Sequence, residues 1–134
     1  MHSAVEAGLV AAAVSGAPST VITLAKGEDV LLSARGAGAI VLPDDAPAPA
    51  LLAAAVPVHL GLSIGWAAVL DRALPPGREL LGGLLGGLAI AALDLGVIGR
   101  RIDAVRRLPQ PRQWADHVAY GLAVGAVLRA HRRA

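Results

Sequence analysis

The stretch from Leu80 to Gly99 reads LLGGLLGGLAIAALDLGVIG, twenty residues in which Asp94 is the single formal charge. At a rise of 1.5 Å per residue, a helix of this length is about 30 Å long, which matches the hydrocarbon core of a bilayer. Its two glycine pairs repeat four residues apart, a spacing that lets helix backbones approach closely in lipid. The stretch therefore predicts a membrane-spanning helix with a packing face.

Three other segments have the same character. Residues 7–25 contain no formal charge, residues 46–70 contain one ionisable group, and residues 113–128 are shorter and more polar. A cleaved signal peptide is the alternative for the first segment, but no Lys or Arg precedes Lys26, so we expect a retained helix. The four predicted spans are residues 5–25, 49–70, 79–99 and 113–130.

The composition favours a membrane protein. Of 134 residues, 55% are apolar and 16% are charged, and the mean hydropathy is +0.61, whereas soluble domains carry about 25% charged residues. With 29 Ala, 16 Gly and no Phe, a water-soluble core would bury little area per residue. The absence of Cys excludes disulfides and thiolate metal sites. The length allows one membrane domain, residues 1–134.

Two connections between the spans carry further predictions. Residues 29–42 are apolar but too short to span, and Arg35 lies within them, so we expect a short interfacial or re-entrant helix. The loop from Arg100 to Arg112 is basic, and beside apolar spans it favours contact with anionic lipid headgroups over nucleic acid. Its predicted headgroup ligands are Arg100, Arg101, Arg106, Arg107 and Arg112.

The flanking residues also indicate an orientation in the membrane. Lys and Arg are more numerous on the side of the membrane that holds residues 29–42 and the loop from Arg100 to Arg112 than on the opposite side. The positive-inside rule therefore places these two connections in the cytoplasm and both termini outside. Trp114 lies beside the basic loop and Trp66 near the other end of the second span. Both fit the aromatic belts that mark the two membrane surfaces.

Polar residues within the predicted spans form a candidate site, since ionisable groups in a membrane helix usually face the bundle interior. Counting along the spans places six of them in the same half of the bilayer: Ser19, Thr20, His59, Asp94, Asp116 and His117. Tyr120 lies on the same helical face as Asp116 and His117. Two interpretations stay open. The groups either satisfy one another as structural hydrogen bonds, or form a polar pocket that relays protons, because His titrates near neutrality. In the pocket interpretation, His59 lies within side-chain reach of Asp94, Asp116 or His117.

The same residues do not favour a metal or cofactor. No pair of His and carboxylate residues has metal-ligand spacing, because the adjacent Asp116 and His117 diverge on a helix. No catalytic residue is assigned, since no nucleophile elbow occurs and the glycines of the third span follow no strand. We therefore predict no metal site, no cofactor and no nucleic-acid partner, and do not favour an enzyme.

Small residues spaced four apart occur in every span and predict close helix contacts. They mark either the centre of the bundle or a face for a second copy or another membrane protein. The predicted packing residues are Gly61, Gly65, Gly82, Gly83, Gly86, Gly87, Gly121 and Gly125.

Three phrases of the sequence are similar to those of a small uncharacterised actinobacterial family of four-helix integral membrane proteins. They are ALDLGVIGRR at 92–101, WADHVAYG at 114–121 and GAPST at 16–20. The resemblance covers most of the chain. It implies a fold of four membrane helices, and it implies no activity, because none is known for the family.

The sequence thus predicts an all-α, four-span transmembrane helical bundle in the plasma membrane, with a short interfacial or re-entrant helix after the first span. The expected function is a structural or accessory membrane component that assembles through Gly-rich helix faces, with the lipid bilayer and a second copy or another membrane protein as partners. The alternative is a small oligomeric transporter or proton-coupled carrier that uses the His and Asp residues. An enzyme acting on lipid is a third class.

Overall fold

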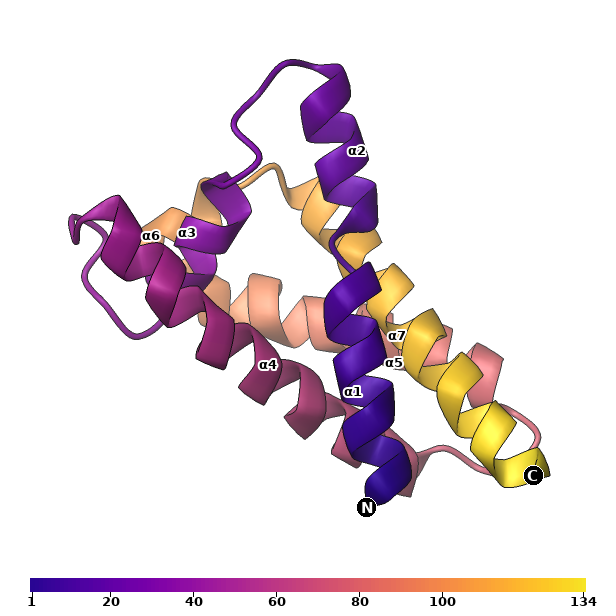
Figure 1. Cartoon of the computed structure of the whole chain (residues 1–134). Helices are drawn as coiled ribbons and strands as arrows, with labels where there is room; N and C mark the ends of the chain where they lie inside the picture. Colours follow the sequence, from indigo (N-terminus) through magenta and orange to yellow (C-terminus); the bar gives the residue numbers. More distant parts are fainter.

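The structure is a computed structural model that describes residues 1–134, and all of its regular elements are helical. Figure 1 shows their arrangement. The elements are α1 (His2–Val14), α2 (Ala17–Ala25), α3 (Leu32–Gly38), α4 (Ala48–Ala73), α5 (Glu79–Leu93), a π-helical turn η1 (Asp94–Ile98), a 3-10 turn η2 (Gly99–Arg101), α6 (Asp103–Arg106) and α7 (Gln110–Arg133).

Three helical stretches are long and apolar enough to cross a membrane. They are His2–Ala25, Ala48–Ala73 and Glu79–Arg101, and each contains most or all of one predicted span. The fourth predicted span lies within α7, which has 24 residues and is more polar than the other three stretches. The all-helical class is confirmed, and length and apolarity support a membrane span for three of the four predicted segments.

The first stretch is not one continuous helix, because the chain breaks between α1 and α2. Pro18 has no backbone N–H to donate to the carbonyl of Val14. The N–H groups of Gly16 and Ala17 also make no backbone bond to the carbonyls one turn earlier. The end of α1 therefore has free carbonyl oxygens that another helix can bind.

The short helix predicted over residues 29–42 is present as α3, but it has only seven residues. Asp29 lies before it, accepts the Leu31 N–H at 2.9 Å and pairs with Arg35. Helix α3 packs on the first half of α4, where a Cβ on Gly38 would overlap with the Leu51 carbonyl. Its two glycines disfavour a longer helix.

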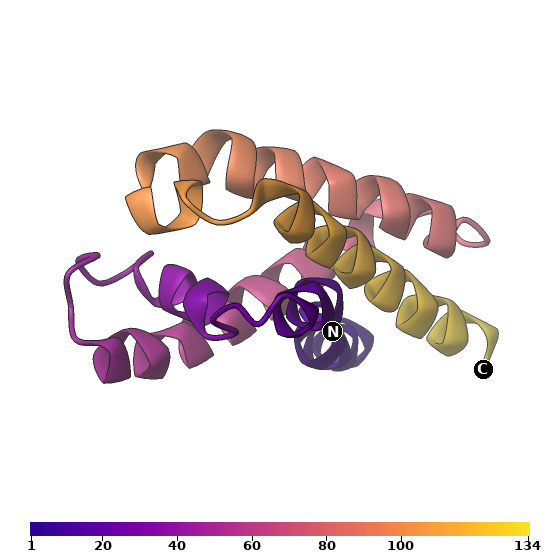
Figure 2. The same ribbon diagram turned by 90° about the horizontal axis from the view of Figure 1, so that it is seen from above.

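Helix α7 lies at the centre of the arrangement. Along its length it packs against α5 on one side and against α1 and α2 on the other. Helix α4 packs on α1 and α3 and makes only limited contact with α5 and α7. Figure 2 shows the α5–α7 pair as one layer and α3 and α4 as a second layer below it, with α1 and α2 seen nearly end-on beside α4 and below α7. The helices therefore cross, instead of running side by side as in a regular bundle.

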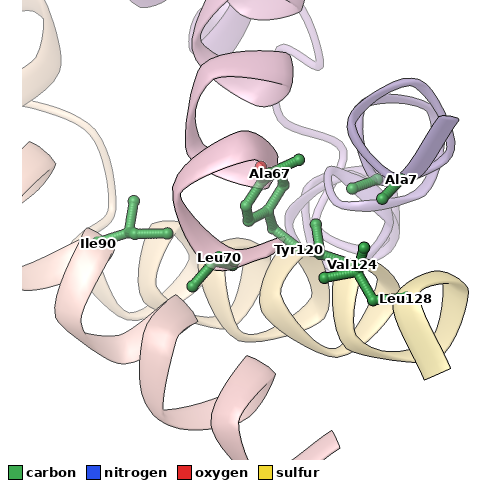
Figure 3. Packing of buried hydrophobic residues seen from close by; sticks show 8 residues of the cluster. Ala7, Ala67, Leu70, Ile90, Tyr120, Val124 and Leu128 are labelled. Carbon is green, nitrogen blue, oxygen red and sulfur yellow. The ribbon is translucent and has the colours of Figure 1, made fainter. Parts of the chain in front are cut away.

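The apolar core forms where α1, α4, α5 and α7 meet (Figure 3). Val124 and Leu128 of α7 are its largest fully buried side chains. Helix α1 contributes Ala7 and Ala11, which have no exposed surface. Such small side chains let α1 lie close to its neighbours, and Ile64 of α4 therefore packs directly on Gly8.

Charged pairs gather at the two ends of the molecule. At the end that holds both termini, Arg132 lies 3.3 Å from Asp71 and 3.4 Å from Glu79, and His131 lies 3.2 Å from Glu6. At the opposite end, Arg112 pairs with Glu28. Between these ends the outward side chains of α1, α2, α4 and α5 include many large apolar residues.

Candidate functional site

The carboxylate of Asp94 is the centre of the polar groups inside the structure. Asp94 follows α5 and begins the π-helical turn η1, and such turns often occur at functional sites. The indole Nε1 of Trp66 donates a hydrogen bond to Asp94 Oδ2 at 3.2 Å. The Nε2 atom of His117 lies 3.7 Å from the same oxygen. Side chains from α4, η1 and α7 thus meet at this point.

The ring of His117 is oriented by its own helix. Its Nδ1 lies 2.8 Å from the carbonyl oxygen of Gln113, one turn earlier in α7. Because a carbonyl only accepts, Nδ1 carries the proton of this bond. Nε2 then faces Asp94, and a second proton on the ring would form an ion pair with that carboxylate. The His117 and Asp94 side chains are about one-fifth exposed, so water or lipid headgroups reach the pair only in part.

Asp116 has a separate role from Asp94. Its Oδ1 accepts the backbone N–H of Ser19 at 2.8 Å, in the first turn of α2, where N–H groups have no helical partner. The buried Ser19 hydroxyl donates to the Gly16 carbonyl at 3.2 Å. Asp116 therefore attaches α2 to α7, while the next residue faces Asp94 because neighbours diverge by about 100° on a helix.

His59 lies outside this cluster. It is an exposed residue of α4, and its Nε2 lies 3.0 Å from the carbonyl oxygen of Ala12. That carbonyl is free because α1 breaks two residues later. His59 makes no hydrogen bond or ion pair with Asp94, Asp116 or His117. The polar groups are therefore divided among different helix contacts and do not form the single pocket of the second interpretation.

Tyr120 and Trp66 complete the contacts between α4 and the other helices. The Tyr120 hydroxyl is buried and donates to the Ser63 carbonyl at 2.5 Å. Trp66, which the sequence predicts in an aromatic belt, is half-buried and donates its indole N–H to Asp94. Sequence reasoning missed this role. One signal in the sequence pointed to it. A buried indole N–H usually requires a hydrogen-bond acceptor, and few side chains within the spans can accept one.

The predicted packing glycines fall into three groups. Gly83 and Gly87 of α5 lie on Gly121 and Gly125 of α7, and a Cβ on any of these four would overlap with backbone of the facing helix. Gly82 and Gly86 face leucine side chains of the α4 end and the following loop. Gly61 and Gly65 have no atom within 4 Å of an added Cβ, because that side of α4 faces outward.

The basic loop residues also differ in their partners. Arg112, predicted as a headgroup ligand, pairs with Glu28 and donates to Thr23 at 3.1 Å. The Arg112 guanidinium lowers the pKa of the Glu28 carboxyl. Arg106 and Arg107 both pair with Asp103, at 2.7 and 3.5 Å. Arg100 and Arg101 are exposed and make no ion pair.

No three His, Asp or Glu side chains lie together as a metal-binding group. No family model, curated protein or solved structure matches this chain. The resemblance to the actinobacterial family therefore stays a prediction.

Proposed function

We propose that this chain is a multi-pass protein of the plasma membrane and serves as a structural or accessory component there. The supporting observation is the distribution of side chains along the helices. Large apolar residues cover the outer faces, whereas pairs of arginine and carboxylate lie at the two ends. In water such a surface is an aggregation hazard, and in a bilayer it is the expected lipid contact.

In this proposal α7 is the fourth span. A helix of 24 residues is about 36 Å long, enough to cross the hydrocarbon core. Four of its polar side chains contact α2, α3, α4 or η1, so they need not face lipid. They are Gln113, Asp116, His117 and Tyr120. Low apolarity is therefore compatible with a central position. The proposed topology puts both termini on the same side.

Association through α4 is the second part of the proposal. Gly61 and Gly65 are spaced four apart on an outward face, which is the pattern that allows a second helix to approach closely in lipid. The predicted packing glycines of α5 and α7 already contact the facing helix or leucine side chains of the same chain. We therefore assign the free face of α4, defined by Gly61 and Gly65, to contact with a second copy of the chain.

Two experiments test these statements separately. The first is a carbonate wash of membranes, which should leave the protein in the pellet, and release into the supernatant would contradict the membrane proposal. The second is light scattering of the protein purified in a mild detergent. We expect a dimer that Gly65→Leu converts to a monomer, while Leu62→Ile on the same helix has no effect. A monomeric wild type would contradict association through α4.

The pair of Asp94 and His117 supports a second candidate function, a proton-coupled carrier. Carboxylate and imidazole lie 3.7 Å apart on different helices, which suits a proton relay. The test is proton flux into vesicles that contain the purified protein. Asp94→Asn should abolish the flux and His59→Leu should leave it intact. Equal flux in empty vesicles would exclude this candidate.

A further inference from the structure

We propose that the end of the molecule near the chain termini holds a binding site for an anionic phospholipid. An open hollow of about 610 Å³ lies beside the N-terminus of α5. Its lining residues are Gly77, Arg78, Glu79, Leu80, Leu81 and Arg129. The site thus combines two arginines from different parts of the chain with two leucines, which matches a ligand that is anionic at one end and apolar at the other.

The positive charge in the hollow is not neutralised by the protein. Arg78 and Arg129 make no ion pair and no side-chain hydrogen bond, although five other arginines of the chain pair with carboxylates. Glu79 also lines the hollow, but its carboxylate is buried and accepts the Gly77 N–H at 3.0 Å and a bond from Arg132 at 3.4 Å. The hollow therefore presents a net positive charge to a ligand.

The apolar half of the site continues along α5. Leu81 and Leu85 are one turn apart on the same face and are 58% and 57% exposed. They form a strip that runs from the hollow toward the middle of the predicted span. A phospholipid whose phosphate group lies between Arg78 and Arg129 would place its acyl chains on this strip. A free phosphate ion would gain nothing from the leucines, so the occupant is a phospholipid.

The inference rests on the proposed membrane location, and its test uses the protein in detergent. Native mass spectrometry would measure binding of phosphatidylglycerol and of phosphatidylcholine with the same acyl chains. We expect wild type to bind phosphatidylglycerol more tightly. The double variant Arg78→Gln/Arg129→Gln should lose roughly tenfold to thirtyfold in that affinity, because each arginine near an anionic headgroup contributes about fivefold.

The matched control is Arg72→Gln/Arg133→Gln, which removes two charges at the same end without touching the hollow. Equal losses in both double variants, or no loss in the first, would overturn the site. Inorganic phosphate at the lipid's concentration should not displace phosphatidylglycerol, and displacement would overturn the choice of a lipid. A carbonate wash of the same variants separates the two proposals, since a protein that stays in the membrane but lacks lipid preference contradicts this inference alone.

Discussion

Gly83 of α5 and Gly121 of α7 lie backbone to backbone, so that a Cβ on either residue would overlap with the carbonyl oxygen of the other. This contact explains why α7 can be central although it is the least apolar of the long helices. Close approach gives the pair extensive dispersion contact without large side chains. It also covers part of the α7 backbone with an apolar neighbour.

The first prediction concerns this contact. Gly83→Ala or Gly121→Ala should destabilise the protein by about 1–3 kcal/mol, because overpacking forces the backbones apart. Gly96→Ala should be neutral or slightly stabilising, since its Cβ enters open space and Ala favours a helix over Gly. The measurement is unfolding in detergent by a rising SDS fraction. Equal midpoints for Gly83→Ala and Gly96→Ala would contradict the packing.

Gly86 provides an intermediate case for the second prediction. An added Cβ there lies 2.5 Å from the Leu70 Cδ2 atom, which is the end of a flexible side chain. We expect Gly86→Ala to cost less than Gly83→Ala, while Gly86→Leu is strongly destabilising because Leu70 is itself buried. Leu88→Ile on the same helix is the matched control. A Gly86→Leu variant that unfolds at the same SDS fraction as wild type would contradict this interpretation.

The third prediction concerns the contacts of Asp94. Trp66→Phe and Asp94→Asn should be coupled, because each variant alters the hydrogen bond that joins the two residues. Bonds between membrane helices give coupling of about 0.6 kcal/mol on average and about 1.7 at most. His59→Leu combined with Asp94→Asn should instead be additive within about 0.5 kcal/mol. Double-mutant cycles of unfolding in detergent measure both coupling energies. Strong coupling between His59 and Asp94 would support the interpretation with a single pocket.

The fourth prediction is a loss of stability in acid. Pairing with Arg112 lowers the pKa of Glu28 below its ordinary value of 4.5. A carboxyl group with a lowered pKa in the folded state stabilises the fold above its unfolded pKa, and this contribution disappears as the pH falls through the folded pKa. Wild type should therefore lose more thermal stability below pH 4.5 than Glu28→Gln. The control is Asp45→Asn, because Asp45 is exposed and makes no hydrogen bond or ion pair. This variant should lose as much thermal stability in acid as wild type.

The fifth prediction concerns topology and uses the absence of Cys in the natural chain. Single cysteines at residues 76 and 133 should react with an impermeant reagent from one side of the membrane, and those at 45 and 103 from the other. The positive-inside rule places the first pair outside. If α7 does not span, residue 133 labels together with residue 103 instead. Comparing how strongly each cysteine is labelled in intact cells and in opened cells distinguishes these results.

The sequence by itself determined the class of structure and the approximate bounds of the apolar segments. Leu80 to Gly99 and residues 49–70 could be located from length and hydropathy alone, because the thickness of a bilayer sets the length of an apolar helix. The glycine pairs also indicated which helices approach closely. Both signals are local, so they can be read without knowing where the other helices lie.

Only the tertiary structure decided which polar groups meet. Counting residues along the spans assumes parallel helices, and it places His59 near the two aspartates and Trp66 near the membrane surface. The helices instead cross, so Trp66 reaches Asp94 while His59 binds a carbonyl that the break in α1 leaves free. Crossing angles depend on how side chains of two helices interlock. A hydrogen bond then requires specific atoms within about 3 Å, which no periodicity within one helix can specify.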